Sequence, residues 1–92
     1  MSKKIFKYEL KDVGIQEIQL PEGAEILCIQ TQNDIPFIWA VVYTNVTFTK
    51  RFFEIYATGQ SFDGNTDRKY IGTYQIKNGA YVFHCFEWLG LS

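Results

Sequence analysis

The sequence contains few of the residues from which common catalytic and metal sites are built. Its 92 residues include two cysteines, two prolines and a single histidine. Cys28, Cys85 and His84 lack the paired spacing of metal-binding motifs, and a structural zinc site needs four ligands. Phosphate-binding loops, dinucleotide fingerprints and nucleophile elbows are also missing. The sequence therefore predicts no metal and no cofactor, and no motif in it specifies a reaction.

An excess of charge of one sign is missing as well. Nine basic and ten acidic residues give a formal net charge of -1. No long-range field therefore favours nucleic acid or an anionic membrane surface. The longest apolar run, Phe37–Tyr43, is far too short to cross a bilayer. Because the first residues do not read as a secretory signal, we expect a cytoplasmic protein with reduced thiols.

Aromatic and β-branched residues are abundant. Hydrophobic residues make up 47% of the chain and aromatic residues 17%, with eight Phe, six Tyr and two Trp. This is too apolar for a disordered chain, and it favours strands over helices. The length suits one compact core, so we predict a single globular domain over residues 1–92.

Short apolar runs divided by turn residues predict an all-β fold. Asn78-Gly79 is typical of a type I′ hairpin turn, and in the first run Phe6, Tyr8 and Leu10 are expected to face the core. We expect about seven antiparallel strands in a small sandwich or open barrel, with one short helix on a face as an alternative. The predicted strands are Lys4–Leu10, Ile15–Leu20, Ala24–Gln32, Phe37–Thr44, Phe48–Ala57, Tyr70–Ile76 and Tyr81–Trp88.

His84 is the natural candidate for acid–base chemistry because histidine titrates near neutral pH. Adjacent strand residues point to opposite faces, so Cys85 cannot be its partner nucleophile. An enzyme using His84 with Glu54 or Glu87 is one alternative. A structural histidine is the preferred interpretation, because no orienting third group can be identified.

The candidate binding surface lies around the one long polar segment, Thr58–Arg68, which we expect to be a loop. Phe52, Tyr56, Tyr70 and Tyr74 can form a face that stacks a base or enters a partner's pocket, although most of these rings are expected in the core. The residues that we select for this surface are Lys50, Arg51, Phe62, Arg68, Lys69, Tyr70 and Tyr74.

Six stretches carry a family resemblance: YEL at Tyr8–Leu10, IQLPEGAEILCIQ at Ile18–Gln30, IWAVV at Ile38–Val42, FEIYATG at Phe53–Gly59, YIGTYQ at Tyr70–Gln75 and AYVFHCFE at Ala80–Glu87. Together they resemble a family of small proteins encoded by bacteriophages and prophages and known as a domain of unknown function. Where family members read Gly-Thr-Gly-His, this chain has Ala57-Thr58-Gly59-Gln60, so that histidine is absent.

The resemblance implies a phage or prophage origin and a setting in the cytoplasm of the bacterial host. Because small phage accessory proteins often bind host factors, we expect a non-enzymatic protein that binds and modulates a host protein, for example a defence component. The alternative is an oligomeric protein that sequesters a nucleotide signal, with rings on the base and Lys or Arg on the phosphate. Pairing of the edge strand Lys4–Leu10 with its symmetry mate would provide a homo-oligomer, although lysines such as those of this strand also commonly protect an edge against pairing.

Overall fold

The computed structural model describes residues 2–11 and 13–91, with only the backbone described at residue 91. These residues form seven strands and no helix, so the all-β prediction is confirmed and the alternative with a short helix is wrong. The strands are β1 (Lys3–Glu9), β2 (Gly14–Pro21), β3 (Glu25–Gln32), β4 (Ile35–Tyr43), β5 (Phe48–Ala57), β6 (Thr66–Ile76) and β7 (Tyr81–Leu91).

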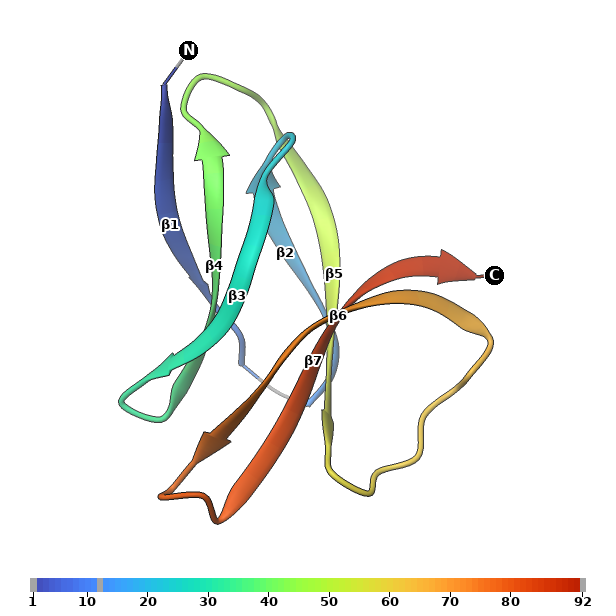
Figure 1. Cartoon of the computed structure of the whole chain (residues 1–92). Helices are drawn as coiled ribbons and strands as arrows, with labels where there is room; N and C mark the ends of the chain where they lie inside the picture. Colours follow the sequence, from blue (N-terminus) through green and yellow to red (C-terminus); the bar gives the residue numbers. More distant parts are fainter. Residues whose placement is uncertain (1, 12, 92) are drawn as a thin grey trace.

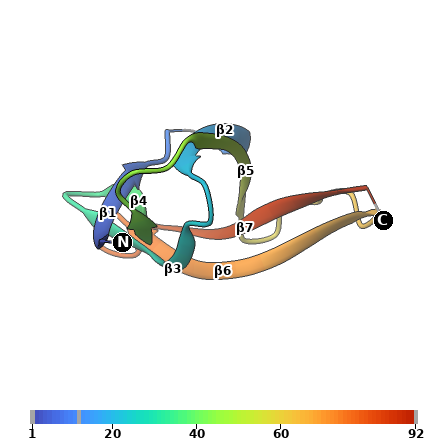
Figure 2. The same cartoon turned by 90° about the horizontal axis from the view of Figure 1, so that it is seen from above.

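The strands make two antiparallel sheets that pack face to face (Figure 1). One sheet has the order β1-β4-β3 and the other the order β2-β5-β7-β6. Because the sheets remain separate, the fold is an open sandwich and not a closed barrel. The Cα atoms extend over 42 × 35 × 16 Å, and the view from above shows the curved four-stranded sheet, with β2 and β5 on one side of the molecule and β6 beside β3 on the other (Figure 2). The N-terminal part of β6 and the C-terminal end of β7 extend beyond the three-stranded sheet in both views.

The turns follow the chemistry that the sequence predicts. The backbone φ angles of Asn78 and Gly79 are 56° and 85°, and the Ala80 N–H donates to the Lys77 carbonyl at 3.1 Å. Positive φ at both central residues defines a type I′ turn, whose twist matches that of the flanking strands. Asn33 and Asp34, with φ of 52° and 64°, connect β3 to β4 in the same way.

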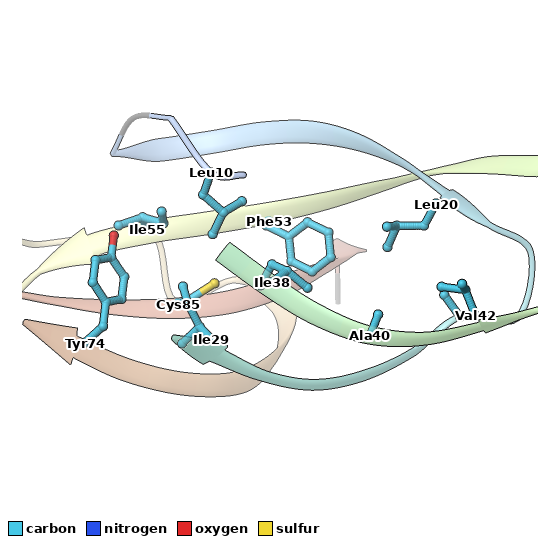
Figure 3. Packing of buried hydrophobic residues seen from close by; sticks show 11 residues of the cluster. Leu10, Leu20, Ile29, Ile38, Ala40, Val42, Phe53, Ile55, Tyr74 and Cys85 are labelled. Atoms are coloured by element: carbon cyan, nitrogen blue, oxygen red, sulfur yellow. The ribbon is translucent and has the colours of Figure 1, made fainter. Parts of the chain in front are cut away.

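The core lies between the two sheets and draws on both of them (Figure 3). Phe53 of β5 and Cys85 of β7 lie near Ile38 of β4 in the middle of this cluster, with Leu20 at one end and Tyr74 at the other. The strands that are apolar on both faces, β4 and β7, each lie inside a sheet, as their sequence predicts. The buried apolar set is Leu10, Leu20, Ala24, Ile29, Ile38, Ala40, Val42, Phe53, Ile55, Tyr74 and Cys85.

A bulge in β6 decides which way its tyrosines point. Tyr70 pairs with Phe86 and Gly72 pairs with Cys85, so Ile71 is an extra residue and the alternation of faces shifts by one. Tyr74 therefore points into the core, where it is 8% exposed. At Gly72 an added Cβ would lie 2.9 Å from the Cγ2 atom of Ile29, because β3 crosses close to β6 there.

Three sequence expectations differ from the structure. Phe6 was expected in the core but is 48% exposed, because the four-stranded sheet does not cover that end of β1. The polar loop ends at Asn65, since Thr66–Arg68 already pair with β7. The predicted strand Ala24–Gln32 is not regular, because a bulge between Ile26 and Cys28 interrupts its pairing and leaves Leu27 exposed.

Candidate binding surface

The outer face of the four-stranded sheet gathers aromatic and ionic side chains from strands that are distant in sequence. Phe53, Ile55 and Cys85 point into the core, so the residues between them point outward. The register of β5 and β7 then fixes the neighbours on this outer face. The directly opposed pairs are Phe52 with Trp88, Glu54 with Phe86 and Tyr56 with His84.

Six rings cover much of this surface, which we call the aromatic face: Phe52, Tyr56, Phe62, Tyr70, Phe86 and Trp88. The ring centroids of Phe52 and Trp88 lie 5.7 Å apart in an edge-to-face arrangement. Tyr56 and Phe62 stack at 4.5 Å, and Phe86 contacts Phe62 at 6.0 Å and Tyr70 at 5.5 Å. Such ring geometries add stabilisation beyond the area that they bury.

A buried ion pair lies beneath the rings. The Arg68 Nε atom donates to the Glu54 carboxylate at 2.8 Å, and the Tyr56 hydroxyl donates to the same carboxylate at 2.5 Å. Glu54 is 4% exposed, and the Arg68 guanidinium lies 4.9 Å from the centroid of the Phe62 ring. Arg68 also donates to the Thr66 hydroxyl. The Arg68 charge is thus neutralised within the fold and not offered to a phosphate.

The loop between β5 and β6 holds Phe62 over this ion pair. The Gln60 side chain accepts a hydrogen bond from the Ala57 N–H, and the Gln60 N–H donates back to the Ala57 carbonyl, both at 3.0 Å. At the other end of the loop the Asp63 carboxylate accepts from the Asn65 N–H at 2.9 Å, an Asx turn. Local hydrogen bonds therefore fix both ends of the segment that carries Phe62.

His84 lies at the edge of the aromatic face in a chain of hydroxyl contacts. Its Nδ1 atom is 2.9 Å from the Thr73 hydroxyl, and its Nε2 atom is 2.6 Å from the Thr58 hydroxyl. Thr73 in turn contacts the Tyr70 hydroxyl at 2.6 Å. Because hydroxyls donate and accept, either neutral tautomer of the ring is satisfied. The two carboxylates that an enzyme would use with His84 are engaged in ion pairs instead, since Glu54 binds Arg68 and Glu87 binds Arg51.

A second ion pair borders a cavity at one opening of the sandwich. Arg51 Nε and Nη2 donate to the two oxygens of Glu87 at 2.6 and 2.8 Å, and Nη1 donates to the Ala24 carbonyl at 2.6 Å. The cavity has a volume of about 270 Å³, and Lys69 and Tyr70 line it together with Arg51. Ligand pockets usually exceed about 300 Å³, so this one suits a small group.

Comparison with known proteins identifies the family of the chain. The model of a domain of unknown function, DUF7352, matches residues 1–89. The chain belongs to the DUF7352 family. Neither the curated proteins nor the solved structures gave a match. The match to DUF7352 therefore covers nearly the whole sandwich, including every strand that carries the aromatic face.

Within residues 2–11 and 13–91 no helix is long and apolar enough to cross a membrane.

The seven residues that we selected from the sequence for the binding surface lie in three different places in the structure. Lys50, Phe62, Arg68 and Tyr70 belong to the outer face, where Arg68 is held by Glu54. Arg51 and Lys69 line the cavity instead, and the expectation that Tyr74 shares a face with Tyr70 is wrong because of the bulge at Ile71. The selection omitted Phe86 and Trp88. Their spacing of two residues from His84 and from each other predicts that they share a face with it. The sequence does not predict that β5 is the neighbouring strand.

Loss of stability in alkaline solution is expected from the buried acidic groups. Burial and then the hydrogen bond to Glu54 raise the pKa of Tyr56 to about 12, and burial raises that of Tyr74 to about 12. Burial also raises the pKa of Cys85 to about 12. The unfolded chain, with ordinary values near 9 to 10, releases these protons first, so the free energy of unfolding falls as pH rises from about 9 towards 12. Below about pH 9 the stabilisation is complete.

Urea unfolding at about pH 8 and about pH 11 measures this decline. The Tyr56→Phe and Tyr74→Phe variants should each lose less stability over this interval than the parent chain. Tyr81→Phe, which removes an exposed hydroxyl, is the control and should follow the parent. A decline that is equally steep in all three variants would contradict the assignment to Tyr56 and Tyr74.

Proposed function

We propose that this chain is a non-enzymatic protein of phage or prophage origin that binds and modulates a host protein, such as a defence component, in the cytoplasm of the bacterial host. The observation that carries the binding role is the aromatic face, in which six rings gather on the side of the sheet opposite the core. The resemblance of the sequence motifs to phage-encoded proteins supports the setting.

The exposure of the rings favours a protein partner. Tyr70 is 55% and Phe62 46% exposed, and both contact the half-buried Phe86. These three rings form one contiguous, partly exposed apolar cluster, which suits an apolar or aromatic side chain of the partner. Clustered exposed aromatics that no other layer covers are typical of interfaces, where Tyr and Trp dominate the binding energy. Phosphate recognition is less favoured because Glu54 neutralises Arg68.

Capture of the partner tests the proposal. A photo-crosslinking amino acid in place of Tyr70 should capture one host protein, whose affinity for the unmodified chain is then measured with purified components. Tyr70→Ala and Phe62→Ala should each weaken that affinity at least about tenfold, as truncation of central interface rings does. Tyr81→Ala, which removes an exposed ring at the far end of the β6–β7 hairpin, is the matched control and should leave it unchanged.

The salt dependence adds a second measurement. Because Arg68, the cation beneath the rings, is paired with Glu54, the affinity should change little between low and high ionic strength. A partner whose affinity responds to salt but not to Tyr70→Ala or Phe62→Ala would contradict the proposal, since it would use a charged surface elsewhere.

Sequestration of a nucleotide signal is the second candidate, and the cavity beside the Arg51–Glu87 pair favours it. Lys69 lines this cavity and forms no ion pair among the described residues, whereas the Tyr70 ring packs on Phe86 at the outer face of the sheet. A lysine can meet the phosphate of such a ligand. Arg51 contributes less, because its donors are already held by Glu87 and Ala24. Titration calorimetry with a nucleotide panel, with Lys69→Ala as the variant, decides between the two candidates.

A further inference from the structure

The first strand, β1, has one edge that no described strand covers. One edge of β1 pairs along its whole length with β4, which in turn pairs with β3. The edge of β1 that faces away from β4 pairs with no described strand. Figure 1 shows β1 at the outer border of the three-stranded sheet. An open edge presents a row of backbone N–H and C=O groups that can pair with another strand.

The hydrogen bonds at the two ends of β1 show which residues present these groups. The Thr44 N–H donates to the Ser2 carbonyl at 3.2 Å, and the Leu10 N–H donates to the Pro36 carbonyl at 2.9 Å. Bonded pairs recur at every second residue of an antiparallel ladder, so the even-numbered residues of β1 turn their backbone groups towards β4. The odd-numbered residues turn theirs outward, and these are Lys3, Ile5, Lys7 and Glu9.

Apolar side chains lie uncovered along the same edge. Ile5 is 60% and Phe6 48% exposed, on opposite faces of the strand. Phe6 borders a groove of about 440 Å³ at the end of the sandwich, across which lies Phe48, 61% exposed. Among the described residues that line this groove, Lys4 alone is charged. An occupant that extends β1 would thus gain both backbone hydrogen bonds and apolar contacts.

We propose that the occupant is a second copy of this chain, with β1 of one copy pairing antiparallel to β1 of the other about a two-fold axis at Phe6. In this register Lys3 of each copy lies opposite Glu9 of the other, and neither residue forms an ion pair within the described part of the chain. The outward-facing Ile5 and Lys7 then form a bonded pair across the axis. The result is a continuous six-stranded sheet with the order β3-β4-β1-β1-β4-β3.

Charge selects this register over its neighbours. An axis at Ile5 places Lys3 opposite Lys7, and an axis at Lys7 places that lysine opposite itself. Like charges directly opposite each other destabilise a strand pair, whereas opposite charges stabilise it. The axis at Phe6 also pairs all seven residues of β1, and it brings the two Phe6 rings together in a pair without backbone hydrogen bonds, where side chains approach most closely.

A charge exchange tests the proposed dimer. Sedimentation of the full chain should show the average mass rising from 10.7 kDa towards twice that value as concentration increases. Lys3→Glu and Glu9→Lys each place like charges opposite one another twice in the dimer, so each should weaken association about tenfold or more. The variant that carries both changes restores opposite charges and should return to within about threefold of the parent. Lys50→Glu, an exposed lysine on β5, is the control.

A proline on the outward side gives an independent readout. Ile5→Pro removes a backbone N–H that points away from β4, so it should abolish the dimer while the monomer stays folded. Tyr70→Ala should leave the dimer intact, which separates this surface from the aromatic face. A chain that stays monomeric at every concentration would overturn the proposal. A dimer that persists in Lys3→Glu and Ile5→Pro would also overturn it, because another surface would then hold the copies together.

Discussion

Replacement of Arg68 by methionine is expected to lower the free energy of unfolding by about 3 to 5 kcal/mol, the usual consequence of leaving one partner of a buried ion pair alone. The side chains of Arg68 and Glu54 are 11% and 6% exposed, so water screens the pair little. Among the described residues, the Glu54 carboxylate would then keep only the hydrogen bond from Tyr56. Since a domain of 92 residues has a total stability of about 5 to 14 kcal/mol, the variant should unfold at least about 12 °C below the parent.

A double variant separates the ion pair from the packing. Glu54→Leu combined with Arg68→Met removes both charges and keeps apolar volume under the rings, so its stability should be closer to the parent than that of Arg68→Met alone. Urea unfolding of the four chains of this cycle gives the coupling between the two residues. If Arg68→Met loses less than about 1 kcal/mol, the pair behaves as an exposed salt bridge and is not the buried centre of the aromatic face.

The local features of the fold could be predicted from the sequence. The boundaries of β5 match the run Phe48–Ala57, and the Asn78-Gly79 turn has the expected positive φ angles. The alternation of Phe52 and Phe53 correctly separates an outer from a core face. These features depend on side-chain period and turn chemistry, which act over a few residues and are therefore readable in a single chain.

The candidate site could be predicted only in part because it depends on pairing between distant strands. The contact of Phe52 with Trp88 needs β5 to lie beside β7, although β6 follows β5 along the chain. The Ile71 bulge, which turns Tyr74 inward, lies beside Gly72, but a single glycine within a strand is equally compatible with close packing of another backbone and does not by itself fix a bulge. Phe6 has the spacing of a core residue, but the extent of the opposing sheet decides its exposure. Period and propensity carry no information about such long-range placement.

Two phenylalanines of the same molecule should respond in opposite ways to truncation, which separates stability from binding. Phe53 is fully buried among residues of both sheets, so Phe53→Ala leaves a cavity and is expected to lower the free energy of unfolding by about 3 to 5 kcal/mol (Figure 3). Phe62 is 46% exposed and rests on Tyr56 from a loop, so Phe62→Ala should cost about 1 kcal/mol or less.

Partner affinity should show the reverse order. Phe62→Ala removes one exposed side of the ring cluster, whereas Phe53→Ala changes no exposed ring and, below its lowered unfolding temperature, should bind nearly as the parent does. Urea unfolding ranks the two variants by their loss of stability, and affinity measurement ranks them by their loss of partner binding. Equal losses of affinity in the two variants would mean that binding follows overall stability. Selective loss in Phe62→Ala would instead place the binding energy in the rings outside the core, where the alternation of β5 and β7 puts them.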